Sequence, residues 1–329
     1  MINDKGCAGS IVRKMLDRLQ SLSFIIFHLS FRAKVATLSF IILHFSFSHA
    51  VAQQHFPNQI PAGNYSGICH LGDRLFAVVD DKHAEDGFYL FRFTIDHESK
   101  RITKAENTGY RSSGLPNRDM EGICYRPSTR TLFISGEKDN EVFEYALDGK
   151  RTGKKLNMPA QFKKAKTNSG IEALTYDTLH HLFYITTERP MRGDTLLRIQ
   201  AFDDDLQPTH QYLYKPDKPV GPKYTQGVSA LCAMGDGRLL VLERQAYVPP
   251  RKINAQTIIT IYEVRPAQSE SLLTKRLVSQ FKTRLTITNR KFANYEGMCA
   301  LSPNLLLLVA DSQNQYKNVL RDWFLLLGI

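Results

Sequence analysis

The sequence predicts an all-β fold, a β-propeller of four-stranded antiparallel sheets, with five blades as the first expectation and six as the alternative. Two observations predict it. A short motif recurs five times along the chain, and each copy is followed by an apolar, β-type run that ends in a carboxylate. Four short strands in each unit of roughly fifty residues are typical of a propeller blade. The longest step between motifs, 67 residues from Ser229 to Glu296, leaves room for a sixth blade.

The recurring motif consists of Ser or Glu, a small residue, an aliphatic residue and then Cys or Thr. Its copies are Ser66-Gly67-Ile68-Cys69, Glu121-Gly122-Ile123-Cys124, Glu172-Ala173-Leu174-Thr175, Ser229-Ala230-Leu231-Cys232 and Glu296-Gly297-Met298-Cys299. We expect each copy to begin the innermost strand of a blade. The four cysteines in equivalent places are then expected to pack as small hydrophobic residues, without disulfide bonds.

The remaining strands of each unit follow in order. The second strands are expected at 75–80, 132–137, 182–188, 239–243 and 305–311, and alternating third strands at 87–95 and 141–147. More polar fourth strands are expected at 101–110 and 210–214. The last unit lacks a fourth strand after Phe324, so we expect residues 55–60 to supply it and to close the ring.

The first fifty residues have the pattern of a secretory signal rather than of a blade. Arg32 and Lys34 precede an apolar run at 36–47, and Ala50-Val51-Ala52 fits a cleavage site. This predicts a leader at 1–52, a mature propeller at 53–329 and a secreted or periplasmic protein without a membrane anchor. Residues 1–34 are then explained by a start codon placed too far upstream. The alternative is a membrane hairpin of two short helices, although neither of the apolar runs at 21–31 and 35–47 reaches the roughly 20 residues of a spanning helix.

The net charge of +11, from 43 basic and 32 acidic residues, does not indicate nucleic-acid binding. The basic residues are scattered and form no stripe interleaved with aromatic side chains. The sequence also holds no Gly-rich phosphate loop, no G-x-S-x-G elbow and no C-x-x-C pair. These absences argue against a serine esterase and against a nucleotide-binding loop.

The first residues of the five motifs are expected to face one another across the central channel. They are Ser66, Glu121, Glu172, Ser229 and Glu296, here called the first ring. Carboxylates held close together repel unless they are protonated or neutralised. Calcium accepts hydroxyl, carboxylate and water oxygens in irregular geometry, so the first ring predicts a calcium site. The alternative is that each residue only hydrogen-bonds the start of its own strand.

A further set of carboxylates ends the second strands, and basic residues follow most of them. The strand-end carboxylates are Asp80, Glu137, Glu188, Glu243 and Asp311, and the basic residues are Lys82, Lys138, Arg189 and Arg244. Carboxylates beside cations at one mouth of the channel favour an anionic, phosphate-bearing ligand. The alternative is a set of solvated ion pairs that contribute little energy.

The segments 117–137, 170–188 and 294–311, with the ending 311–324, resemble the family called "esterase-like activity of phytase". The resemblance implies a propeller with repeated acidic residues and a phosphoesterase or phosphodiesterase-like activity. The order Ser, Glu, Glu, Ser, Glu and the stretch Val79-Asp80-Asp81-Lys82 also resemble, more distantly, the calcium-activated apyrases. That likeness implies calcium in the channel and hydrolysis of nucleoside di- or triphosphates.

Together these observations favour a secreted, calcium-dependent hydrolase of phosphate esters or anhydrides. The first ring would hold calcium, a strand-end carboxylate would serve as general base, and the basic residues would offset the charge on phosphate. Two alternatives stay open. One is a non-catalytic propeller that uses calcium structurally and binds an anionic glycan or protein. The other is an apyrase-like nucleotidase.

Overall fold

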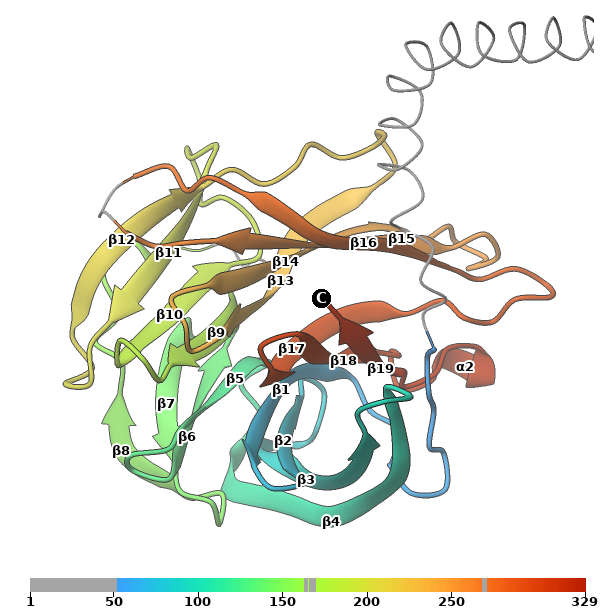
Figure 1. Cartoon of the computed structure of the whole chain (residues 1–329), viewed down its shortest axis with the longest axis horizontal. Helices are drawn as coiled ribbons and strands as arrows, with labels where there is room; N and C mark the ends of the chain where they lie inside the picture. The colour runs from blue at the N-terminus through green and yellow to red at the C-terminus, as the bar shows by residue number, and fades with distance from the viewer. Residues whose placement is uncertain (1–51, 163–164, 166–169, 268–270) are drawn as a thin grey trace, which may run out of the picture. The chain divides into compact units, whose positions relative to one another are not determined.

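The computed structural model describes residues 52–162, 165, 170–267 and 271–329, and it confirms an all-β propeller of five blades (Figure 1). Apart from Ala52, the expected leader and its cleavage signal lie outside the described residues. No helix among the described residues is long and apolar enough to cross a membrane.

The strands follow one another blade by blade, and within each blade sequence neighbours pair antiparallel. Blade 1 holds β1 (Tyr65–Gly72), β2 (Leu75–Asp80), β3 (Glu85–Asp96) and β4 (Arg101–Pro116); blade 2 holds β5 (Met120–Arg126), β6 (Thr131–Gly136), β7 (Glu141–Tyr145) and β8 (Arg151–Lys155). Blade 3 holds β9 (Ile171–Asp177), β10 (Leu182–Thr187), β11 (Leu197–Phe202) and β12 (Pro208–Tyr214). Blade 4 holds β13 (Thr225–Ala233), β14 (Leu239–Tyr247), β15 (Gln256–Val264) and β16 (Arg276–Arg284). Blade 5 holds β17 (Asn294–Ser302), β18 (Leu305–Asp311) and β19 (Phe324–Gly328), with the short helix α2 (Tyr316–Val319) before β19.

The innermost strands are β1, β5, β9, β13 and β17, as the repeated motif predicts. Each contacts the next around the channel, and β17 contacts β1 (Figure 1). Apolar side chains from adjacent blades pack into a separate cluster at each of the five junctions. At the junction of blades 5 and 1, for example, Phe76 and Phe93 pack with Leu307 and Phe324. The apolar residues of the strands therefore cover both faces of every blade, and each face packs against a neighbouring blade.

The four motif cysteines, Cys69, Cys124, Cys232 and Cys299, are buried and free of disulfides, which confirms their expected packing role. Small residues beside the first ring let the inner strands approach closely. A Cβ atom on Gly67 would lie 2.3 Å from the carbonyl oxygen of Glu121, and one on Gly122 would lie 2.7 Å from the amide nitrogen of Leu174. Glycine at these positions therefore sets the narrow bore of the channel.

The ring closes by pairing the two ends of the described propeller. The sheet of blade 5 has three strands, and its last strand β19 pairs with Gln54 through backbone hydrogen bonds of 2.8 and 2.9 Å between Gln54 and Phe324. The N-terminal segment thus takes the fourth place, at Gln54 rather than at residues 55–60. A buried Asp322 accepts hydrogen bonds from Ser312 (2.5 Å) and Gln315 (2.8 Å) beside this junction.

The 67-residue step does not contain a further sheet among the described residues. Blade 4 instead has a longer second strand, since β14 spans nine residues, whereas β2, β6 and β10 span six. The additional length carries the β14–β15 hairpin beyond the corresponding hairpins of the other blades. Blade 4 is therefore the place where the repeat departs from its symmetry.

Every inner strand has a shift in pairing register at its first-ring residue, which marks a β-bulge. The shifts fall at Ser66, at Glu121-Gly122, at Glu172, at Ser229 and at Glu296. A bulge adds one residue to one strand of a pair, bends that strand and re-aims the side chain of the additional residue. The five residues identified from the sequence therefore share one backbone feature as well as one motif position.

Candidate functional site

The first ring meets at the axis of the propeller. Ser66, Glu172, Ser229 and Glu296 line one small cavity there, of about 10 Å³, together with Gly122 beside Glu121. This is about the space of a single water molecule. The two hydroxyls donate to backbone carbonyls, Ser66 to Asn64 (3.4 Å) and Ser229 to Tyr295 (3.2 Å). Their oxygen lone pairs stay free to accept or to ligate.

A second ring of side chains lies next to the first ring, toward the mouth of the channel. Its members pair with the residue two places before each first-ring residue. They are Asp81, Glu137, Glu188, Arg244 and Asp311, opposite Asn64, Asp119, Gly170, Gly227 and Asn294. Four carboxylates and one guanidinium therefore occupy equivalent positions in the five blades.

In two blades, the residue found in the second ring is not the one that the sequence predicts. Asp81 takes the place expected for Asp80, and Arg244 takes the place expected for Glu243. All five blades carry the bulge, so the difference lies in the sequence: the expected carboxylates of blades 1 and 4 stand one residue earlier in their second strands than those of blades 2, 3 and 5. A shift of one residue also turns a side chain to the other face of the sheet.

Asp80 and Glu243 accordingly do not join the other strand-end carboxylates. The Asp80 carboxylate is buried and accepts the backbone N–H of Lys82 at 3.0 Å. Glu243 is also buried, where it accepts from the Tyr214 hydroxyl (2.5 Å) and the Lys275 ammonium (2.7 Å). Glu243 therefore belongs to a hydrogen-bonded ion pair between strands rather than to the channel.

Three carboxylates gather at the side of the mouth formed by blades 1 and 2. One oxygen each of Asp81, Asp119 and Glu121 lies within 4.8 Å of the other two. The Lys82 ammonium contacts Asp81 at 2.7 Å and Asp119 at 2.5 Å, yet the Lys82 side chain is 59% exposed. Asp119 sits in the left-handed region, with φ of 57°, directly before β5. Of the three residues of this acidic cluster, Glu121 was expected from the sequence as a metal ligand, whereas Asp81 and Asp119 were not.

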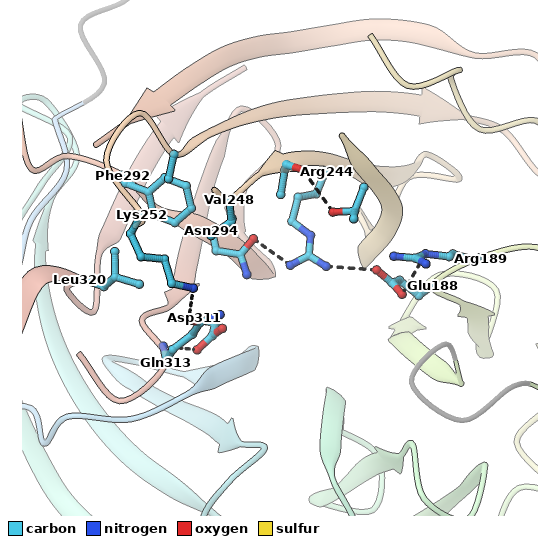
Figure 2. A pocket seen from close by; sticks show the side chains of 13 residues that line it. Glu188, Arg189, Arg244, Val248, Lys252, Phe292, Asn294, Asp311, Gln313 and Leu320 are labelled. Atoms are coloured by element: carbon cyan, nitrogen blue, oxygen red, sulfur yellow. Dashed lines mark hydrogen bonds and ion pairs between the residues drawn. The ribbon is translucent and has the colours of Figure 1, made fainter. Parts of the chain in front are cut away.

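On the opposite side of the mouth, the buried side chain of Arg244 neutralises two carboxylates. Its guanidinium forms ion pairs with Glu188 (3.2 Å) and with Glu296, and it donates to the Asn294 side chain at 2.8 Å (Figure 2). Burial alone would lower the pKa of Arg244, but the charges of Glu296 and Glu188 raise that pKa above its ordinary value. Arg244 is therefore a permanent cation inside the ring.

The crowded carboxyl groups hold protons more tightly than free carboxyl groups do. Burial, and then the charges of neighbouring carboxylates, raise the pKa values of Glu121 and Glu172 well above the usual range. Burial raises the pKa of Asp81 to about 7, although Lys82 opposes it. Burial likewise raises the pKa of Glu296 to about 8, against the opposing charge of Arg244. The cause in each case is loss of hydration together with like charge.

The donors at the mouth fit a hard divalent cation. All of the acidic cluster's ligand atoms are carboxylate oxygens, which calcium and magnesium prefer over nitrogen or sulfur. One carboxylate oxygen of Asp81 is buried without any hydrogen-bond partner among the described residues. Buried acceptors are normally satisfied, and a cation ligated by this oxygen would satisfy it. A cation at Asp81, Asp119 and Glu121 would relieve the crowding that raises the proton affinity of Asp81 and Glu121.

Comparison with known proteins identifies the family. Residues 60–313 match the family described as "Phytase-like: Esterase-like activity of phytase". The chain belongs to this family. The resemblance seen in the sequence is thereby confirmed, and the match runs from blade 1 to the end of β18 in blade 5.

No curated protein sequence matches this phytase-like chain. Among solved structures, a nidogen/laminin complex matches with 12% identity and a TM-score of 0.43, over 80% of this chain and 84% of that one. Streptogramin B lyase matches with 11% identity and a TM-score of 0.40, over 85% and 98%. Virginiamycin B lyase from Staphylococcus aureus matches with 11% identity and a TM-score of 0.39, over 85% and 99%. None of these likenesses bears on the chemistry of the phytase-like site.

The basic residues expected at the mouth have different placements. Lys82 and Arg244 lie among the carboxylates, and Arg189 contacts Glu188 at 3.4 Å while its side chain is 46% exposed. The Lys138 side chain is exposed, and no carboxylate among the described residues forms an ion pair with it. The mouth of the phytase-like propeller therefore has one buried cation and two at its rim.

Proposed function

We propose that this phytase-like protein is an exported, calcium-dependent hydrolase of phosphate esters, and that the reaction takes place at the mouth formed by the two rings. The observation that carries the proposal is the cluster of Asp81, Asp119 and Glu121, with its unsatisfied carboxylate oxygen, beside the surface cation Lys82. Carboxylates held together next to lysine and arginine suit a bound cation and a phosphate group at one place.

The residues of the acidic cluster would hold calcium, with the first ring below them. Calcium held by these residues would supply a Lewis acid for a phosphoryl oxygen and would help to orient water. Lys82 and Arg189 extend from the rim, where their charges would attract the dianion of a monoester and offset charge that develops on phosphate. An exported protein meets high free calcium, so a site of modest affinity is sufficient.

Asp311 is the best placed general base of this site. It belongs to the second ring, lines the cavity beside Arg244 and accepts the backbone N–H of Gln313 at 2.6 Å. Burial raises its pKa, which brings its basicity closer to neutral pH, where a general base works best. Asp311 would take the proton of the attacking water as the new P–O bond forms. The bond from phosphorus to the ester oxygen breaks, and the alcohol leaves after it gains a proton.

A panel of phosphate substrates tests the proposal. The mature protein is assayed with p-nitrophenyl phosphate, bis-p-nitrophenyl phosphate, phytate and nucleoside diphosphates, with calcium or with a chelator. We expect turnover of at least one ester with calcium, and its loss with chelator and in Glu121→Gln. Calorimetric titration of calcium into the same two proteins reports binding separately from turnover. Inactivity on the whole panel at saturating calcium would contradict a hydrolase.

The second candidate is a non-catalytic binding propeller, and the placement of Arg244 favours it. Arg244 already neutralises Glu188 and Glu296. Calcium at the opposite side of the mouth would neutralise the remaining carboxylates and so stabilise the fold. The exposed cations at the rim would then bind an anionic glycan or protein. In that case calcium would raise the melting temperature, and Glu121→Gln would remove this effect. No substrate of the panel would be hydrolysed.

A further inference from the structure

A cavity of about 180 Å³ lies beside the second ring, where blades 4 and 5 depart from the repeat. On the side of the axis it is lined by Glu188, Arg244 and Asp311. On the other side it is lined by Val248, Phe292 and Leu320 (Figure 2). The cavity therefore joins the charged mouth to an apolar wall.

The apolar wall is a built part of the fold. Ala255, Leu285, Phe292 and Leu320 form a hydrophobic cluster of their own, separate from the five clusters between blades. Backbone hydrogen bonds of 2.8 Å join Asn254 to Leu285 and Leu285 to Ala255, which fixes the two loops against each other. These residues come from the connections that follow β14, β16 and β18. The wall is thus preformed, as ligand sites usually are.

The charge inside the cavity is uneven. Lys252 lines it, and its ammonium lies 3.4 Å from the Gln313 side-chain oxygen and 4.9 Å from the centre of the Tyr316 ring. No carboxylate of the described residues lies within 4 Å of this ammonium, whereas Arg244 is fully paired. Lys252 therefore offers an anion-binding charge directly next to apolar side chains.

We propose that this cavity binds the alcohol portion of the substrate, and that this portion is an aryl or branched-alkyl group. The proposal rests on the proposed function and specifies its substrate class. The phosphate would lie at the mouth, between Lys252 and the rings, and the apolar group would lie against Val248, Phe292 and Leu320. An apolar protein cavity of about 150 Å³ holds benzene, so the volume is sufficient for a phenyl group.

The same geometry disfavours polyphosphorylated substrates. A sugar or inositol ring with several phosphates would place charge against Phe292 and Leu320, both of which are buried. Burial of a charge without a partner is costly. We therefore expect phytate to be a poor substrate, and a monoester of an apolar alcohol to be a good one.

Benzyl phosphate and methyl phosphate provide the test, because both release an alkyl alcohol and differ mainly in the apolar group. We expect kcat/KM for benzyl phosphate to exceed that for methyl phosphate by about 30-fold, from burial of the phenyl ring. Benzylphosphonate should likewise bind more tightly than methylphosphonate in calorimetric titration, which requires no turnover. A ratio near one in both experiments overturns the proposal.

Val248→Asp places a charge on the wall at a side chain that is 40% exposed, so the fold should tolerate it. We expect the benzyl-to-methyl ratio of kcat/KM to fall at least 10-fold in this variant, because the added charge disfavours the phenyl ring more than the methyl group. Val220→Asp, at a residue that is 61% exposed and does not line the cavity, is the matched control. Lys252→Met should raise KM for both esters alike, since Lys252 would serve the shared phosphate.

The outcomes separate the two proposals. If the wild-type protein hydrolyses neither ester nor any member of the substrate panel, the proposed function fails and this inference fails with it. If it hydrolyses both esters, but Val248→Asp leaves their ratio unchanged, only the inference about the cavity fails. A fall in the ratio in Val220→Asp equal to that in Val248→Asp would also overturn it.

Discussion

Two sides of the same mouth deal with crowded carboxylates in different ways. At blades 1 and 2, the carboxylates of Asp81 and Asp119 lie beside Lys82, whose side chain is 59% exposed. At blades 3 to 5, Glu188 and Glu296 enclose Arg244, whose side chain is only 14% exposed. A solvated ammonium screens its neighbours weakly, whereas a buried guanidinium is bound firmly to its partners. The first side therefore keeps its oxygens available to a ligand, and the second side is already complete.

Removal of the buried cation should produce the largest effect. Arg244→Met leaves Glu296 without a cation and Glu188 with only the partly exposed Arg189, and we expect a loss of about 3–5 kcal/mol in the free energy of unfolding. Urea unfolding in chelator at pH 7.5 measures it. The control is Arg189→Met, whose partly exposed pair should contribute less than about 1 kcal/mol. If both variants lose the same amount, the two sides do not differ as described.

Glu121→Gln should act in opposite directions with and without calcium. In chelator we expect it to stabilise the protein by on the order of 1 kcal/mol, because the amide resembles the protonated acid that crowding favours. With calcium we expect affinity to fall roughly 10-fold or more, since a charged ligand is lost. Thermal unfolding with and without calcium measures both. Glu98→Gln, at an exposed turn, should change neither value; a destabilised Glu121→Gln in chelator would contradict the crowding.

Stability without calcium should fall as the pH rises. The pKa values of Asp81, about 7, and Glu296, about 8, lie above the ordinary values of 3.8 and 4.5. The folded protein therefore binds more protons than the unfolded chain between about pH 4 and pH 8, and its stability is lost as the pH passes through the raised pKa values. We expect a higher melting temperature at pH 5.5 than at pH 8.5 in chelator.

Calcium should reverse this trend, because protons and calcium compete for the same carboxylates. The calcium-induced rise in melting temperature is expected to be larger at pH 8.5 than at pH 5.5. An equal rise at both values would indicate that calcium binds away from the two rings.

Lys82→Met should have the smallest effect on stability. Its ammonium is largely solvated, so we expect a change below about 1 kcal/mol. Calcium affinity should rise a few-fold, because a like charge beside Asp81 and Asp119 is removed. Calorimetric titration measures the affinity, and Lys104→Met, at another exposed lysine that pairs only with a surface glutamate, is the control. Weaker calcium binding in Lys82→Met would contradict the placement of the metal at blades 1 and 2.

The propeller was predictable because its determinants repeat. Five copies of one motif, each followed by an apolar run, fix the inner two strands of every blade, and the first ring follows from the motif's first position. The closing pair at Gln54 was predictable to within one residue, because the last unit visibly lacks a strand. Repetition compensates for the weakness of each separate strand signal.

The second ring was only partly predictable, because register depends on the backbone. Glu137, Glu188 and Asp311 follow their apolar runs directly, so counting to the end of each run identifies them. In blades 1 and 4 that count stops one residue early, at Asp80 and Glu243, which lie opposite Tyr65 and Val228 rather than at the second-ring position. Counting pairs back through each hairpin from Ser66 and Ser229 would have revealed the difference, although only with the bulge known.

The acidic cluster and the cavity carried still weaker signals. Asp119 precedes its strand in a left-handed turn, where Asp is common for conformational reasons alone. The apolar wall joins loops near Val248, Phe292 and Leu320, which are far apart in sequence and belong to no repeat. Such contacts arise from tertiary packing, which periodicity does not encode.

The pairing of Gln54 with Phe324 has a consequence for the folding pathway. These residues stand at opposite ends of the described propeller, so their contact closes almost the longest loop that the chain allows, and such long-range β pairing forms slowly. The neighbouring inner strands β1 and β17, which carry Ser66 and Glu296, meet across that same seam. During refolding, therefore, the complete set of channel oxygens should appear only in the final kinetic phase. A partly made chain would remain an open arc of blades, and calcium would report on the moment at which the two ends meet.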